Sequence, residues 1–196
     1  MTTNISTNSK EYTKYYLNKF NIWYRRLFPV DIPFKYIAKS CCKGKILDIG
    51  CGPGRYLAFF PDRAIGVDHN MDFIEYTHKR GFTSYHTSEL HNIENQKFDT
   101  LLFAHILEHM CMYDGETLIN TYIKYLNKNG RIIIIVPHGY CYNNDPTHVL
   151  YYGPEQVEML SNRIGFHIRK SFYHPFPDFL SKYFITDGIY ILEPNK

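Results

Sequence analysis

Two patterns of apolar residues divide the chain near residue 41. In the first part, aromatic residues spaced three or four positions apart predict an amphipathic helix. These residues are Tyr12, Tyr16, Phe20 and Trp23. Pro29 and Pro33 should end that helix, so we expect residues 1–40 to form a helical, aromatic N-terminal cap.

From residue 45 onward, short aliphatic runs alternate with segments of helical periodicity. Strands are expected at Lys45–Ile49, Ala64–Asp68, Phe82–Tyr85, Phe98–Phe103 and Arg131–Val136. Helices are expected near residues 54–60, 70–80, 105–111 and 115–127, with Asn129-Gly130 as a stop before the fifth strand. Runs such as ILDI and IIIIV are apolar at every position, which is typical of a parallel sheet covered by helices on both faces.

The C-terminal part continues the same alternation. Gly153-Pro154 favours a helix start, and Gly165 favours its end after Asn162. Two further strands are expected, at Phe166–Tyr173 and Gly188–Leu192. Because no linker interrupts the pattern, we expect residues 41–196 to form one doubly wound α/β domain.

Composition narrows the class of protein. The chain has 196 residues, 44% hydrophobic and 21% charged, which excludes a disordered chain, a collagen-like repeat and a coiled coil. The longest aliphatic run, Ile132 to Val136, is far shorter than the ~20 residues of a membrane span. Because the first residues are polar, we expect no secretory signal. Five cysteines, an odd number and without a CxxC pair, indicate a reducing, cytoplasmic compartment.

Charge and histidine content bear on the partner. The net charge is only +3, and the longest basic clusters are pairs, Arg25-Arg26 and Lys79-Arg80, so a nucleic-acid partner is not favoured. The sequence also contains 10 histidines, and histidine is both the commonest metal ligand and the side chain that titrates nearest neutral pH.

A glycine turn follows the first aliphatic strand, in Ile46-Leu47-Asp48-Ile49-Gly50-Cys51-Gly52-Pro53-Gly54. In doubly wound sheets such a turn lies where nucleotides bind. The dinucleotide fingerprint GxGxxG does not fit, because Arg55 occupies its third glycine position. Asp48 would repel a pyrophosphate but suits an ammonium group, so the turn favours S-adenosylmethionine (SAM), which joins adenosine to an α-amino acid.

Acidic residues after the next two strands support this ligand. Asp68 ends the second strand, where a carboxylate can accept both ribose hydroxyls. Ser88-Glu89-Leu90 follows the third strand, where a side-chain acceptor and a backbone N–H can meet the adenine edge.

The segments LDIGCGPGR, AIGVDHN, FDTLLFAHILEHM and NKNGRIIIIVP resemble the class I SAM-dependent methyltransferases in order and spacing, over roughly residues 40–193. The resemblance implies a seven-stranded, Rossmann-like sheet whose last strand is antiparallel, and methyl transfer from SAM to a nucleophile. The residues implied or expected to bind SAM are Asp48, Gly50, Cys51, Gly52, Asp68, His69, Ser88, Glu89, Leu90, Ala104 and His105.

Histidines and an acid gather after the fourth strand. His105, Glu108 and His109 have the spacing of one helix face, and His148, in Asp145-Pro146-Thr147-His148, should lie at the same sheet edge. Small-RNA 2′-O-methyltransferases and some ubiquinone-pathway O-methyltransferases have a similar acid-x-x-Glu-His motif that binds a divalent metal. In those families an acid replaces His105, so this nitrogen-rich set would favour Fe, Mn, Co or Zn over Mg.

The role of the cluster stays open at this stage. His105, Glu108, His109 and His148 could bind a metal. Without a metal, the catalytic candidates are His105, His148 and Glu108, with His105 or His148 accepting the proton of the acceptor. In a purely structural cluster, Glu108 and His109 would only orient the helix. The sequence is also similar to small bacterial methyltransferases with GVDHN and DPTHV segments, which implies a small-molecule acceptor, methylated on a hydroxyl or similar nucleophile. Alternatives are an RNA-terminus 2′-O-methyltransferase and a non-catalytic SAM-binding subunit. The sequence contains no signal for the oligomeric state.

Overall fold

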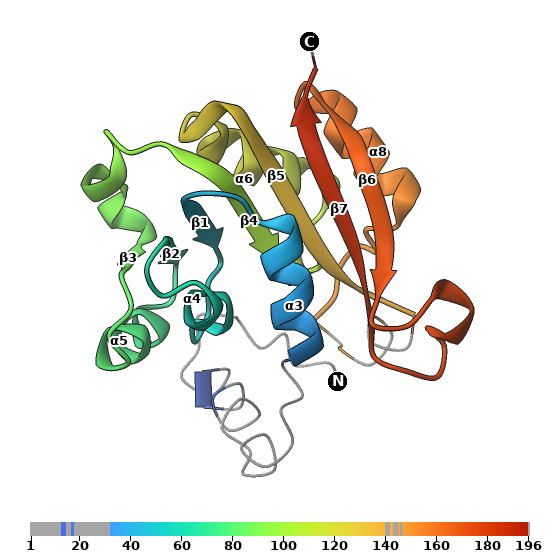
Figure 1. The fold of residues 1–196 in the computed structure, drawn as a ribbon, viewed down its shortest axis with the longest axis horizontal. Coiled ribbons are helices and arrows are strands. Elements are labelled where there is room, and N and C mark those ends of the chain that lie inside the picture. Colours follow the sequence, from blue (N-terminus) through green and yellow to red (C-terminus); the bar gives the residue numbers. More distant parts are fainter. Residues whose placement is uncertain are drawn as a thin grey trace.

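The computed structural model describes residues 32–139, 142, 145 and 147–195, together with the helical residues Thr13, Lys14 and Leu17. In this part of the chain, one seven-stranded sheet has the order β3-β2-β1-β4-β5-β7-β6 (Figure 1). Its strands are β1 Ile46–Ile49, β2 Ala64–Asp68, β3 Ser84–His86, β4 Phe98–Ala104, β5 Leu126–His138, β6 Phe166–His174 and β7 Thr186–Pro194.

The strand directions confirm the expected α/β class. Neighbouring strands from β3 to β5 are parallel, whereas β7 lies antiparallel between β5 and β6. The chain runs outward from β1 to β3 and then crosses back to β4 on the other side of β1. The strand order therefore reverses between β1 and β4, and in open α/β sheets ligands bind at the carboxyl ends of the strands at such a reversal.

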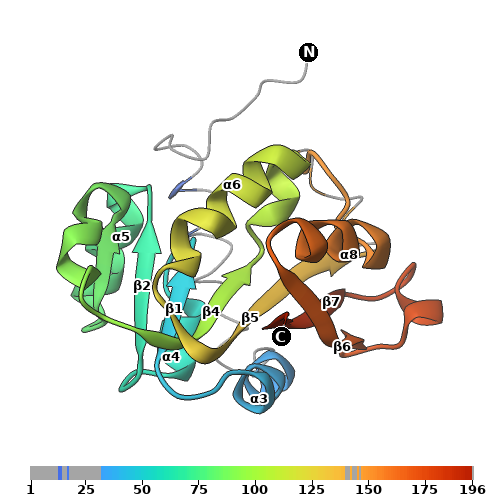
Figure 2. The same ribbon diagram turned by 90° about the horizontal axis from the view of Figure 1, so that it is seen from above.

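Helices cover both faces of the sheet (Figure 2). They are α3 Ile32–Cys41, α4 Arg55–Phe59, α5 Met71–Lys79, α6 Met112–Ile123 and α8 Pro154–Arg163. Apolar residues of α6 and α8 pack with one set of strand residues, including Leu47, Leu101 and Ile134. Those of α3 and α4 pack with the alternate set, including Ile46 and Leu102. Because successive strand residues point to opposite faces, the all-apolar runs of the sequence bury both faces.

Three short 3-10 helices complete the elements, η1 Thr87–Ile93, η2 Leu107–His109 and η3 Asp178–Leu180. Of the helix expected at residues 105–111, only the three residues of η2 are helical. His105 has a left-handed φ of 56°, and its N–H donates to Ile135 O at 2.8 Å, so the ladder of β4 extends to the position where the helix should have begun.

Two other boundaries differ from expectation. Pro33 lies in the first turn of α3, where a missing N–H costs nothing, so it permits a helix that the sequence pattern did not predict. Strand β5 begins at Leu126, which pairs with Phe98, and the next pair is Arg131 with Thr100. Asn129-Gly130 therefore belongs to an irregularity within β5 rather than a stop before it.

The expected N-terminal cap lies mostly outside the described residues. Thr13 is buried, and its Oγ1 accepts a hydrogen bond from Asn70 Nδ2 at 2.9 Å, next to the start of α5. Among the residues that the structure describes, no helix has the length and apolar character needed to cross a membrane.

Candidate functional site

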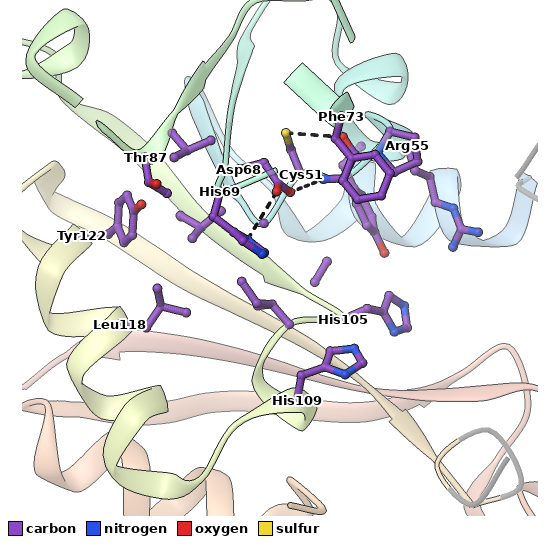
Figure 3. A pocket seen from close by; sticks show the side chains of 18 of the residues that line it. Cys51, Arg55, Asp68, His69, Phe73, Thr87, His105, His109, Leu118 and Tyr122 are labelled. Atoms are coloured by element: carbon purple, nitrogen blue, oxygen red, sulfur yellow. Dashed lines mark hydrogen bonds and ion pairs between the residues drawn. The ribbon is translucent and has the colours of Figure 1, made fainter. Parts of the chain in front are cut away.

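A cavity of about 390 Å³ opens at the carboxyl ends of β1, β2 and β4 (Figure 3). Its wall includes seven residues that the sequence assigned to SAM binding, namely Gly50, Cys51, Gly52, Asp68, His69, Ala104 and His105. The cavity thus coincides with the reversal of strand order, where this class of sheet binds its ligands.

The glycine turn brings open backbone to the cavity. Gly50 and Gly52 have φ of 73° and 50°, in the left-handed region that favours glycine. A Cβ on Gly52 would meet no atom within 4 Å, and the Gly52 N–H donates to Oδ2 of Asp68 at 2.8 Å. This turn is therefore fixed to the end of β2 while leaving room for a ligand.

Asp68 is buried at the cavity wall. Its Oδ1 accepts a hydrogen bond from the Asn70 N–H at 2.9 Å and lies 3.5 Å from His69 Nδ1; Figure 3 shows Asp68 and His69 together. A carboxylate has about four lone-pair sites, so Asp68 can accept further hydrogen bonds from ligand hydroxyls while the backbone holds its orientation.

Asp48 lies within β1, behind the glycine turn and outside the cavity lining. It is only 1% exposed, and its Oδ2 has no hydrogen-bond partner among the described residues. Burial, followed by repulsion from Asp68, raises the pKa of Asp48 to about 8. Without a ligand the carboxyl group is therefore mostly protonated at neutral pH, and a nearby cation would favour its ionised form.

The residues expected at the adenine edge lie next to the cavity rather than in its lining, which includes their neighbour Thr87. Ser88 Oγ contacts His86 Nδ1 at 2.7 Å, and Glu89 Oε2 accepts from the His86 N–H at 2.9 Å. Leu90 packs against the core. These contacts form the N-terminal cap of η1.

His105 lies between two buried carboxylates. Its Nδ1 is 3.6 Å from Glu108 Oε1, and its Nε2 is 3.4 Å from Asp187 Oδ2. Burial by itself would lower the pKa of His105, but the charges of Asp187 and Glu108 outweigh it and raise the pKa well above the usual value. Each ring nitrogen of His105 therefore faces a buried carboxylate oxygen.

The other three residues of the predicted cluster do come together. Glu108, His109 and His148 each offer one ligand atom, and these atoms lie within 4.8 Å of one another. The rings of His109 and His148 have centroids 5.1 Å apart. Glu108 is 1% exposed, and its backbone carbonyl accepts the Val149 N–H at 2.7 Å, which fixes the loop of His148 beside it.

Hydrogen bonds define the tautomers of both histidines. Nδ1 of His148 faces the carbonyl oxygen of Tyr142 at 2.8 Å, so it must donate. Nδ1 of His109 faces Thr147 Oγ1 at 3.0 Å, and the hydroxyl proton of Thr147 goes to Asp145 Oδ1 at 2.6 Å. His109 therefore donates as well. The Nε2 atom of each neutral ring keeps its lone pair, and the bonding of the other ring nitrogen is typical of metal-binding histidines.

Some of these contacts could be anticipated from the sequence and others could not. Asp145 and Thr147 belong to the segment that led to His148, so a local pattern pointed to the groups that orient His109. No local pattern pointed to Asp187, because its contact with His105 depends on the antiparallel register of β7 with β5 and β6.

Comparison with known proteins agrees with this geometry. Residues 47–134 match a family model described as a methyltransferase domain, and this segment includes the glycine turn, Asp68 and the turn after β4. Over this segment the chain carries a methyltransferase domain. Among curated proteins, no sequence matches the chain.

Solved structures share the fold of the methyltransferase. A SAM-dependent methyltransferase from Archaeoglobus fulgidus is 19% identical with a TM-score of 0.68, covering 94% of this chain and 100% of its own. A putative type 11 methyltransferase from Sulfolobus solfataricus is 20% identical with a TM-score of 0.64, covering 84% and 92%.

A magnesium protoporphyrin IX methyltransferase from Synechocystis, solved with bound S-adenosylhomocysteine, is 10% identical with a TM-score of 0.65, covering 96% of each chain. A second structure of that enzyme contains bound SAM.

Proposed function

We propose that the enzyme transfers the methyl group of SAM to a hydroxyl group of a small-molecule acceptor, with a divalent metal held by Glu108, His109 and His148. The observation that carries the proposal is the convergence of three ligand atoms within 4.8 Å of one another. In addition, Oε2 of buried Glu108 has no hydrogen-bond partner among the described residues.

SAM is assigned to the cavity with its adenosine toward β2 and its methionine end toward β1 and β4. Asp68 receives the ribose hydroxyls, and the open backbone at Gly50 and Gly52 contacts the ligand directly. Asp48 supplies negative charge for the ammonium group from behind the turn. The cavity is lined by both the glycine turn and His109, so one end of the donor lies next to the proposed metal site.

The donor set fits a transition metal. Two neutral imidazoles and one carboxylate, with further positions open, favour Fe, Mn, Co or Zn over Mg. When bound, such an ion supplies Lewis acidity that lowers the pKa of an adjacent hydroxyl. The resemblance implied a fourth ligand, His105, but the contacts of its two nitrogens with Asp187 and Glu108 place it outside the proposed set.

Each residue has a separate task in this proposal. Thr147 and Tyr142 orient the imidazoles of His109 and His148, Glu108 provides charge, and the cavity wall holds SAM so that its methyl group can meet the acceptor oxygen. As the acceptor oxygen bonds to the methyl carbon, the bond from that carbon to the sulfonium sulfur breaks and the hydroxyl proton passes to solvent, so the products are a methyl ether, S-adenosylhomocysteine and a proton. The four described cysteines are free thiols, which suits the cytoplasmic location that we also propose. Neither the RNA-terminus nor the non-catalytic alternative is favoured.

Metal binding by the full chain tests the proposal. We would remove metal by chelation and titrate Mn²⁺, Co²⁺ and Zn²⁺ into wild type, His109→Ala and His148→Ala by calorimetry. His167→Ala is the matched control, since His167 is exposed on β6. We expect one site in wild type and the control, and at least about tenfold weaker binding in the other two. No binding in wild type, or equal affinity in all four proteins, would contradict it.

A further inference from the structure

A chain of charged groups connects strand β7 to the proposed metal site. From Asp187 Oδ2 the chain passes to His105 Nε2 at 3.4 Å, and from His105 Nδ1 to Glu108 Oε1 at 3.6 Å. The side chains of Asp187 and Glu108 are only 4% and 2% exposed. Both carboxylates thus face the same imidazole ring in an interior where their charges are poorly screened.

Three elements contribute to this chain. Asp187 lies near the start of β7, opposite Pro137 of β5 and His174 of β6, so neighbouring strands hold it on both sides. His105 directly follows β4, and Glu108 lies in η2. Figure 3 shows His105 and His109 on the turn that follows β4. A strand held between two neighbours is therefore connected to the short turn that contains Glu108.

The backbone of His105 points to the same role. Its φ of 56° makes it the one described residue other than glycine with a positive φ. Non-glycine residues in this region persist where surrounding contacts determine their conformation, and they cluster at functional sites. The contact with Asp187 and the hydrogen bond from the His105 N–H to Ile135 O are such contacts, and they fix the ring between the two carboxylates.

We propose that Asp187 and His105 are positioning residues that orient Glu108 for metal binding. The inference rests on the proposed function, because it assigns these residues to the same site. With Oε1 of Glu108 next to His105, the carboxylate cannot rotate freely, and Oε2, which has no partner among the described residues, stays available. Residues that support a metal ligand in this way typically change affinity by about 10–100-fold when mutated.

A double-mutant cycle on metal affinity tests the proposal in the full chain. The variants are Asp187→Asn, His105→Asn and the double variant. Asparagine suits position 105 because it tolerates positive φ better than most residues. Affinity for Mn²⁺ and Zn²⁺ is measured by calorimetry without acceptor, and folding is checked by thermal unfolding. Asp62→Asn is the control, since this exposed carboxylate lies in the turn before β2 and takes no part in the chain of charges.

We expect each single variant to bind metal about 10–100-fold more weakly and the double variant to lose little beyond His105→Asn alone, because Asp187 acts through His105. SAM affinity of Asp187→Asn should stay near that of wild type, since Asp187 does not line the cavity. Wild-type affinity in Asp187→Asn, or additive losses in the double variant, would overturn this inference while leaving the metal site in place. No metal binding by wild type would overturn the proposed function itself.

Should Asp187→Asn fail to fold, His105→Asn alone decides the matter. Weaker metal binding with intact thermal unfolding supports the inference, and wild-type affinity overturns it.

Discussion

At the scale of single residues, Asp48 is the group whose chemistry depends most on the ligand. It is 1% exposed, with a pKa raised to about 8 by burial and by the charge of Asp68. The unfolded chain ionises this carboxyl near pH 4, while the folded protein keeps its proton up to about pH 8. Folding therefore becomes less favourable as pH rises through this window, unless a cation binds.

Replacing Asp48 should stabilise the unliganded protein but weaken its binding of SAM. Asp48→Asn removes a poorly solvated acid, so we expect the unliganded protein to gain about 1 kcal/mol at pH 8, or about 2–4 °C in midpoint. SAM affinity should fall at least about tenfold, because the ammonium loses its counter-charge. Thermal unfolding and calorimetry measure both, with exposed Asp62→Asn as control. A lower midpoint together with unchanged affinity would contradict this role.

Proton release should accompany SAM binding. Because the unliganded pKa is about 8 and the bound cation favours the carboxylate, binding at pH 7 should release close to one proton, and affinity should rise between pH 6 and 8. Calorimetry in buffers with different ionisation enthalpies counts that proton. The Asp48→Asn variant should release none; equal release by the variant would assign the proton to another group.

Asp68 should contribute to SAM binding mainly by accepting hydrogen bonds from the ribose hydroxyls. Two charge-assisted hydrogen bonds at about 1.5–3 kcal/mol each predict that Asp68→Ala weakens SAM binding at least about tenfold. Exposed Asp72→Ala on α5 is the matched control, and equilibrium binding of SAM is the measurement. Unchanged affinity would show that Asp68 does not bind the ribose. Tighter binding of NADH than of SAM would contradict the assignment of the whole cavity to SAM.

At the scale of elements, the turn between β1 and α4 has little tolerance for side chains. Gly50 has a φ of 73°, and an added Cβ would lie 2.5 Å from Ile106 Cδ1. Gly165 has a similar φ of 79°, but a Cβ there would meet no atom within 4 Å. A side chain at either glycine would therefore have the same unfavourable left-handed backbone, but only at Gly50 would it also be crowded.

This pair makes a matched test. Gly165→Ala should cost about 1–2 kcal/mol from left-handed strain alone, whereas Gly50→Ala should cost more, because Ile106 must also shift, and should weaken SAM binding. Chemical denaturation gives both free energies of unfolding. Equal costs for the two variants would show that crowding at Gly50 is relieved without penalty.

The turn after β4 shows where local patterns stop being sufficient. Helical spacing placed His105, Glu108 and His109 on one face, but His105 continues the ladder of β4 and only Leu107–His109 is helical. The trio at the site is instead Glu108, His109 and His148, and a strand far along the sequence supplies Asp187. Spacing pointed to this segment, while contacts between distant elements decided which of its side chains lie close together.

At the scale of the whole molecule, the elements were predictable because each carries its own pattern. The ILDI and IIIIV runs mark buried strands, and Gly153-Pro154 marks the start of α8. The position of β7 between β5 and β6 could not be predicted, because the periodicity of a sequence does not indicate which strands pair. Its antiparallel direction was expected only from the family resemblance. Seven of the residues expected to bind the cofactor line the cavity, because they follow strand ends, whose placement at one sheet edge is a general property of the fold.

The central claim is that methyl transfer needs the metal site of Glu108, His109 and His148. The most direct measurement follows transfer of the labelled methyl group from SAM to the small-molecule fraction of a cell extract, before chelation, after chelation, and after return of Mn²⁺, Co²⁺ or Zn²⁺. We predict loss of transfer on chelation, recovery with at least one ion, and SAM affinity that stays nearly constant throughout. Full transfer by the exhaustively chelated enzyme, with no metal by elemental analysis, would contradict the claim.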